Sequence, residues 1–498
     1  MPIHPFISKY SEYLVPALIL VLSMLVYLPK YDAPQAMFWD ENYHIASAQK
    51  HIDGIMYMEP HPPLGKMLMA LSEALVGVNS DVDKSALNRT DYISGSAVPQ
   101  DMAYTGFRLP STLLMALSVL FFYGIIHRIT RRKWLAAAFT SLVIFDNALV
   151  VHSRSAMLEG IQLFFILAAL YYMVRTITSN KAISLANYAI LGVFIGLTIA
   201  VKLNGAILLL LFVMLYGVDQ WDNIRHWRWL PLLKRLGVTV PAGVLPLLVV
   251  FFGIFYIHIG MGSELAANRT YKASGEYLNY IRNDQTFTPA AFVTGMKDNW
   301  KFMSEYADGV PRLDVCKPGE NGSYAMSWPV GKKSINYRWD KDTIDGKVQV
   351  RYKQLVANPV VWFSVLLGII LSVGLVISRF VYGNKEKDPQ LFLWICAFTT
   401  LYACYMIAIL QIDRVMYLYH YLVPLVFGAL NLSLVFTYIF RDDVVANNRH
   451  TLINVTAFVI LIVGVFAWFS PFTYGFQLTE DEFALRNWFS FWQLEVVR

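Results

Sequence analysis

The sequence predicts an all-α, polytopic membrane protein with about eleven transmembrane helices. Of its 498 residues, 56% are hydrophobic and only 15% are charged, against roughly 25% charged residues in ordinary soluble domains. Apolar windows of about 20 residues, each long enough to cross a bilayer, recur from end to end. Their approximate bounds are 13–30, 107–127, 135–151, 158–175, 185–201, 203–219, 236–258, 359–379, 390–410, 418–440 and 452–470.

Basic residues cluster in alternate short loops, and this alternation predicts the orientation in the membrane. The positive-inside rule places these loops in the cytoplasm, with the N-terminus inside and the C-terminus outside. The first apolar segment lacks a small-residue cleavage site, so we expect an uncleaved span. The net charge of +6 then reflects topology and predicts no nucleic-acid partner. The basic loop residues are Lys9; Arg128, Arg131, Arg132 and Lys133; Arg175 and Lys181; Arg225, Arg228, Lys234 and Arg235; Arg379, Lys385 and Lys387; Arg441 and Arg449.

Two large segments fall on the outer side in this topology. The first is the loop 31–106, in which Glu41–Asp53 and Lys66–Val76 have amphipathic helical spacing and are expected to lie in the membrane interface. The second is polar and is expected to form a small cap. The predicted division is 1–258 (spans 1–7 with the first outer loop), 259–358 (outer cap), 359–470 (spans 8–11) and 471–498 (outer tail).

Ionisable residues gather at the outer ends of the predicted spans. Any one of them alone is compatible with a snorkelling or helix-end charge, and Asp40-Glu41 alone with a helix cap. As a set they predict a common polar cavity. Arg and Lys there suit a phosphate, and the absence of a dinucleotide or P-loop motif favours a lipid phosphate. The set is Asp40, Glu41, His44, His61, Lys66, Arg108, Asp146, His152, Arg154, Glu159, Lys202, His258, Asp413, Arg414 and His420.

Two motifs in the first outer loop resemble the protein O-mannosyltransferase family. Phe38-Trp39-Asp40-Glu41 is followed by His61-Pro62-Pro63-Leu64-Gly65-Lys66, and that family has an Asp-Glu pair followed by a His-Pro-Pro-Leu-Gly-Lys turn. The similarity continues, in family order, along nearly the whole chain. The later matching pieces are Phe107-Arg108-Leu109, Phe145-Asp146-Asn147, Ser153-Arg154, Leu158-Glu159, Val201-Lys202, Ser327-Trp328-Pro329, Tyr419-His420-Tyr421 and Pro471-Phe472-Thr473-Tyr474-Gly475.

The resemblance implies a C-type glycosyltransferase fold of about eleven spans, with its active site facing the lumen or periplasm. It also implies a polyprenyl-phosphate sugar donor, most simply mannose, and a Ser or Thr acceptor in a protein or peptide. The segment 259–358 is too short for the β-trefoil of eukaryotic members, and Glu159 stands where many members have Asp. We therefore expect a bacterial or minimal member in the inner membrane, with its site facing the periplasm.

The resemblance also assigns roles. Asp40 would be the general base, with inversion at the anomeric carbon, and Glu41 would orient acceptor or sugar hydroxyls. Arg108, with Lys202 and Arg414, would bind the donor phosphate. No metal-ligand motif is present, although His44, Glu41 and Asp40 could gather with His61 around a divalent cation. The expected substrate-binding residues are His61, Lys66, Glu159, Trp328 and His420.

Two other functions stay open at this point. A related transferase that adds aminoarabinose to lipid A would share topology and donor chemistry but not the acceptor. A transporter or lipid flippase would be expected to show paired half-molecules and broken helices at the midplane. Here the two halves differ and the polar residues lie at the outer ends, which favours an enzyme.

Overall fold

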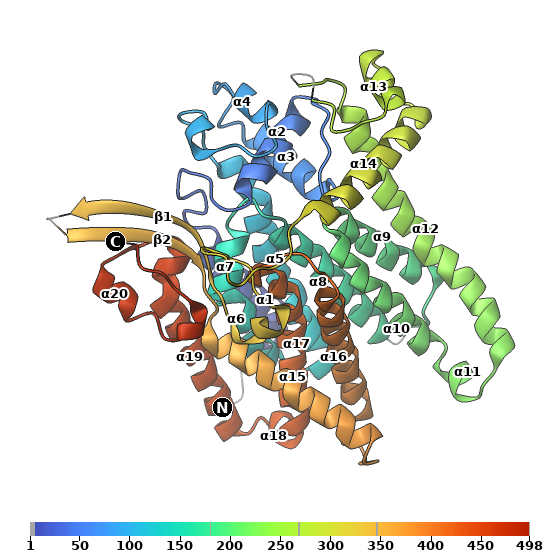
Figure 1. Cartoon of the computed structure of the whole chain (residues 1–498). Helices are drawn as coiled ribbons and strands as arrows, with labels where there is room; N and C mark the ends of the chain where they lie inside the picture. The colour runs from blue at the N-terminus through green and yellow to red at the C-terminus, as the bar shows by residue number, and fades with distance from the viewer. Residues whose placement is uncertain (1–4, 180, 267–268, 345–346, 498) are drawn as a thin grey trace. The chain divides into compact units, whose positions relative to one another are not determined.

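The computed structural model describes residues 5–179, 181–266, 269–344 and 347–497, and most of them are helical (Figure 1). The chain forms two compact units. Unit 1 comprises Met1–Pro29, Ala116–His152 and Arg312–Arg498, and unit 2 comprises Lys30–Met115 and Ser153–Pro311. The long helix α5 (Thr105–Thr130) has residues in both units.

Unit 2 holds the first outer loop and a bundle of apolar helices. α9 and α12 pack closely because Gly192 faces Gly243, where an added Cβ would overlap the Gly243 carbonyl. Small residues at such crossings let two backbones approach within a membrane. Besides the first part of α5, the elements are α2 (Glu41–Ile52), α3 (Leu64–Val76), α4 (Ser85–Asn88), η1 (Gly95–Ala97), α8 (Leu158–Ile177), α9 (Leu185–Val201), η2 (Leu203–Leu209), α10 (Leu210–Asp219), α11 (Trp221–Arg225), α12 (Trp229–Met261), α13 (Gly275–Arg282) and α14 (Pro289–Gly309).

Unit 1 is built around α17, whose residues are nearly all buried. α15, α16 and α6 pack against it. Besides the rest of α5, the elements are α1 (Pro5–Tyr27), α6 (Lys133–Ile144), α7 (Asn147–Ser153), η3 (Ala325–Val330), β1 (Ile335–Ile344), β2 (Lys347–Leu355), α15 (Pro359–Phe380), α16 (Pro389–Leu410), η4 (Leu418–Tyr421), α17 (Leu422–Ile439), α18 (Arg441–Ala446), α19 (Arg449–Tyr474), β3 (Gln477–Leu478), α20 (Glu480–Ala484) and η5 (Ser490–Trp492).

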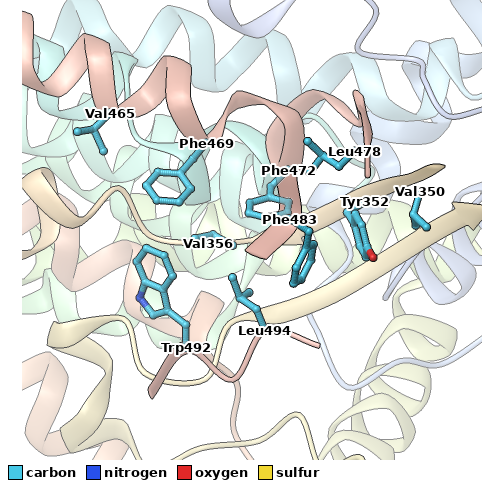
Figure 2. Close-up of a cluster of buried hydrophobic side chains, with 10 residues drawn as sticks. All are labelled: Val350, Tyr352, Val356, Val465, Phe469, Phe472, Leu478, Phe483, Trp492 and Leu494. Carbon is cyan, nitrogen blue, oxygen red and sulfur yellow. The ribbon is translucent and has the colours of Figure 1, made fainter. Parts of the chain in front are cut away.

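The mostly helical chain also contains a small antiparallel sheet, in the order β1-β2-β3, which the sequence did not predict. Its inner side is an aromatic cluster, in which Tyr352 of β2 lies against Phe472 and Phe483, and Phe469 packs on Trp492 at the other end (Figure 2). Alternate residues of a strand point to one face, so burial of this face keeps the segment extended. β1 and β2 occupy part of the segment expected to be an outer cap, and β3 belongs to the predicted outer tail.

Within the described residues, seven helices are long and apolar enough to cross a membrane, or eight if α6 and α7, bent by 61°, form one span. Three shorter apolar helices, Glu12–Tyr27, Leu185–Val201 and Leu203–Asp219, occupy further predicted spans. The multi-pass prediction is confirmed, but the count of eleven is not. The two helices expected in the first outer loop are present as α2 and α3. Their place in the membrane interface stays a prediction, as does the four-part domain division.

Candidate active site

The acidic pair lies where the chain turns into α2. Asp40 is the residue before the first turn of the helix, and its side chain makes no capping hydrogen bond. Glu41 is in the first turn and is fully buried, so the pair does not cap a surface helix. The preceding Trp39 has a left-handed backbone with a φ of 54°. A bulky residue in this region costs about 1–3 kcal/mol and is held there by its surroundings.

The Glu41 carboxylate is bound by four N–H groups of unit 2. Oε1 accepts from Arg108 Nε at 2.7 Å and from the backbone N–H of Ala156 at 2.8 Å. Oε2 accepts from Arg108 Nη2 at 2.8 Å and from the Phe38 N–H at 3.1 Å. A carboxylate offers about four lone-pair positions, so these bonds leave none for the substrate hydroxyl that Glu41 was expected to orient.

The guanidinium group of Arg108 is likewise fully hydrogen-bonded within the protein. Its Nη1 donates to the carbonyls of Asp32 at 2.6 Å and Pro34 at 2.8 Å, and Nη2 also donates to that of Ala36 at 2.8 Å. With the two bonds to Glu41, all five guanidinium N–H groups have acceptors, and the side chain is completely buried. No N–H group is therefore left for the phosphate contact expected from the sequence.

A second polar group joins the start of α3 to α8 and to the end of α9. Lys202 Nζ donates to Glu159 Oε1 at 2.6 Å, and Gln162 Nε2 donates to the Lys202 carbonyl at 3.1 Å. Lys66, the last residue of the His-Pro-Pro-Leu-Gly-Lys motif, is buried and forms an ion pair with Glu59. Gly65 beside it lets α3 approach α8, because a Cβ there would overlap Leu158. The motif therefore positions a lysine against the core of unit 2.

Electrostatic coupling shows that these residues form one cluster with His61. His61 keeps some accessible surface, yet it lies deep among protein atoms. Desolvation lowers its pKa well below the usual value, and the charges of Lys202 and Lys66 lower it further. Desolvation by burial also lowers the pKa of Lys66, against the opposing effect of Glu59. The predicted residues of unit 2 thus include an acidic turn and a nearby lysine-histidine cluster.

The other predicted site residues belong to unit 1. Trp328 is completely buried; its Nε1 donates to Ser323 Oγ at 2.9 Å, and its ring stacks on His420 with centroids 6.1 Å apart. The expectation that Trp328 covers a sugar is therefore not met by its position, which is that of a core tryptophan. Arg414 is half-buried, and no ion-pair partner for it occurs among the residues that the structure describes.

The structure contains a buried pair of histidines, of which the sequence analysis identified only one. His51 of α2 lies with its Nε2 3.4 Å from Nδ1 of His258, at the end of α12, and Tyr57 packs against both rings. His258 stood out as an ionisable residue at a span end, whereas His51 carries no motif that would single it out. Across the described residues there is no group of three or more His, Cys, Asp or Glu side chains that could hold a metal ion.

Comparisons with known proteins relate the sequence to protein mannosyltransferases. Residues 17–260 match the family model of dolichyl-phosphate-mannose-protein mannosyltransferases, and residues 302–492 match that of the C-terminal four-transmembrane region of protein O-mannosyltransferases. A polyprenol-phosphate-mannose–protein mannosyltransferase of Mycobacterium tuberculosis is 24% identical over 483 residues, which cover 87% of this chain and 81% of that protein.

Other relatives are longer than the matched region. The dolichyl-phosphate-mannose–protein mannosyltransferase 5 of Candida albicans is 26% identical over 45% of this chain. The chain spans only 30%, 24% and 34% of the lengths of three fungal relatives. A solved S. cerevisiae protein O-mannosyltransferase Pmt1-Pmt2 complex bound to the sugar donor overlaps with a TM-score of 0.77 at 17% identity, covering 96% of this chain and 92% of that one. This overlap confirms the predicted C-type glycosyltransferase fold. Two family models that together span most of the sequence show that the chain belongs to the protein O-mannosyltransferase family.

Proposed function

We propose that this chain is an inverting glycosyltransferase that moves mannose from a polyprenyl-phosphate carrier to a Ser or Thr hydroxyl of a protein. The observation that carries the proposal is the Asp40-Glu41 turn, locked by Arg108, in a chain that both family models match. We place the reaction at the periplasmic face of a bacterial inner membrane, with the basic loops in the cytoplasm.

In this mechanism Asp40 is the general base. The acceptor oxygen attacks the anomeric carbon while the bond from that carbon to the carrier phosphate breaks, and the hydroxyl proton passes to the Asp40 carboxylate. The carrier leaves as polyprenyl phosphate, and attack from the opposite face inverts the configuration. Asp40 suits this role because it is only partly buried and its side chain makes no capping hydrogen bond to α2. A positioned base contributes about 10²–10⁴-fold in rate.

We assign Glu41 and Arg108 as positioning residues. Their paired bonds tie the start of α2 to the carbonyls of residues 32–36 and to Ala156. The strained Trp39 backbone lies between these bonds and Asp40. The pair thus fixes the direction in which Asp40 leaves the helix start, and positioning of this kind is a large part of catalysis by transferases.

The donor phosphate requires other cations. Lys202 is one, because its ammonium group is nearly buried beside the Glu159 carboxylate, and the phosphodiester of the donor carries the same single negative charge as that carboxylate. Arg414 is the second, because its guanidinium has no ion-pair partner in the described chain and can bind two phosphate oxygens at once.

The test is transfer by the purified protein in lipid nanodiscs. Wild type, Asp40→Asn and the control Asp81→Asn, an exposed acid of the same outer loop, receive polyprenyl-phosphate mannose and a Ser/Thr-rich peptide pool. We expect transfer by wild type and Asp81→Asn, and donor binding without turnover by Asp40→Asn. Equal turnover of all three would remove Asp40 from the mechanism. Transfer to added lipid A with every peptide untouched would refute the protein acceptor.

Orientation has a separate test. Reporter fusions that are active only in the periplasm, placed after residue 497 and within the loop 31–106, should be active, and a fusion in the loop after Arg379 should be silent. The reverse pattern would overturn the proposed topology without touching the chemistry.

A further inference from the structure

Helix α14 carries an apolar stripe that the described parts of the chain leave uncovered. Val293 and Trp300 lie seven residues apart, so they follow one line along the helix. They are 52% and 53% exposed, and Phe287, just before the helix, is 55% exposed. The opposite side, with Ala291, Asn299 and their neighbours, is buried. An exposed apolar patch of this kind marks a surface that meets a partner or a membrane.

The level of α14 relative to the bilayer follows from α12. α12 has 33 residues, and about 20 are needed to cross the hydrocarbon core. With Lys234 near its start marking one border, the helix reaches the other border in its last few turns. There Phe292 of α14 packs against Phe252 and Tyr256, with ring centroids 6.4 and 5.6 Å apart. In Figure 1, α14 crosses the end of α12 instead of running beside it. α14 therefore begins where α12 leaves the hydrocarbon.

The basic and acidic side chains of α14 lie at different angular positions around the helix. Lys297 and Lys301 are exposed beside the apolar stripe. Lys297 has no ion-pair partner in the described chain, and Lys301 lies 3.8 Å from Glu305. The exposed Glu305, twelve residues after Val293, lies about 120° around the helix from it. Asp298, on the same side, accepts hydrogen bonds from the Ser274 N–H and hydroxyl. The order apolar, basic, acidic is that of a helix lying in the membrane interface, with Glu305 toward water.

We propose that α14 is a membrane-surface helix. Its Val293–Trp300 stripe enters the boundary between acyl chains and headgroups, and Lys297 and Lys301 bind the headgroups of anionic phospholipids. Charge complementarity supports this partner, since each lysine near an anionic surface contributes attraction. Continuity supports it as well, because Phe287, just before α14, packs against Tyr256 and Gly260. At this end of α12, Ile257 and Met261 are 44% and 38% exposed.

This surface connects to the acidic turn through unit 2. Asn299, on the buried side of α14, lies beside His258. His258 contacts His51 of α2, the helix that begins directly after Asp40. A membrane contact on α14 therefore supports the helix that carries the acidic pair, through two intervening side-chain contacts.

The experiment measures depth and needs no turnover. The native cysteines are removed (Cys316→Ser, Cys396→Ala, Cys404→Ala), and a fluorophore is placed at Val293→Cys or, as the matched control on the same helix, Glu305→Cys. The protein is held in nanodiscs that contain lipids with a quencher near the headgroup. Because position 293 should lie in the interface and position 305 in water, we expect roughly threefold stronger quenching at 293. Equal quenching at both positions would overturn the proposal.

A second comparison tests the lipid class. Including phosphatidylglycerol in place of part of the phosphatidylcholine should increase quenching at Val293→Cys. Lys297→Gln with Lys301→Gln should abolish this increase, whereas the exposed pair Lys332→Gln with Lys341→Gln, in unit 1, should preserve it. Quenching that ignores phosphatidylglycerol in all variants would refute the headgroup contact. Neither readout depends on mannose transfer, so failure of the proposed function leaves this test intact.

Discussion

Replacing Arg108 with Lys separates a positioning role from a phosphate-binding role. Lysine keeps the charge, but its three N–H groups extend from a single point, so it cannot bind Glu41 and the carbonyls of Asp32, Pro34 and Ala36 together. At least two of the five bonds are lost. Each bond to a charged group contributes about 1.5–3 kcal/mol, and impairing a buried ion pair costs about 3–5 kcal/mol. We take about 3–5 kcal/mol as the total.

Two quantities are measured for the protein in nanodiscs. One is the melting temperature, detected by intrinsic fluorescence, and the other is the affinity for polyprenyl phosphate. In a unit of this size each kcal/mol shifts the melting temperature by about 2–4 °C, so Arg108→Lys should melt roughly 6–20 °C lower. The control Arg312→Lys alters an ion pair with Asp413 whose side chains are 84% and 83% exposed, and such pairs contribute at most about 1 kcal/mol.

Two results would refute this reasoning. A variant that melts like wild type but binds polyprenyl phosphate weakly would show that Arg108 is a phosphate ligand after all. A variant that melts lower yet turns over with an unchanged kcat would show that the Glu41–Arg108 lock does not position Asp40.

Three further predictions follow from the same contacts. Glu159→Gln should lower the melting temperature because it removes the carboxylate that pairs with the buried Lys202 ammonium group, and adding Lys202→Met should restore most of the loss. Additive losses in the double variant would contradict the pairing. Because burial holds the pKa of His61 below its usual 6.5, the unfolded chain binds a proton that the folded chain does not as the pH falls through 6.5. Stability is therefore full at pH 7 and lost toward pH 5, and His61→Asn should flatten that loss of melting temperature. Arg414→Gln should raise the KM for the donor by about 10-fold or more, the equivalent of one charged hydrogen bond, with an unchanged melting temperature; an unchanged KM would exclude Arg414 as a phosphate ligand.

Hydropathy predicted most of the helices because crossing a bilayer demands long apolar segments, and α2 and α3 were visible through their amphipathic spacing. The hairpin of β1 and β2 was missed because β2 alternates only over Val348, Val350 and Tyr352, inside a polar segment. What holds it is the distant aromatic cluster around Trp492, and such long-range burial leaves no local signal.

The candidate site was also predicted only in part from the sequence. Residue type and motif identified Asp40, Glu41 and Arg108 as site residues. Which of them is available to substrate depends on backbone carbonyls. The acceptors at residues 32–36 that occupy Arg108 have no signature in side-chain identity. Trp328 shows the same limit, because a tryptophan that stacks on a sugar and one that fills a core read alike until burial is known.

The interleaving of the two units has a consequence for biosynthesis. Every segment of unit 2 has been translated once the ribosome passes Pro311. Unit 1 opens with the first helix but waits for Trp492 to close the cluster against β2. Domains tend to fold in the order of their synthesis, so unit 2 and its acidic turn should be assembled while α1 still lacks its later partners in unit 1. Such an early helix would need either the insertion machinery or the lipid itself to hold it during elongation.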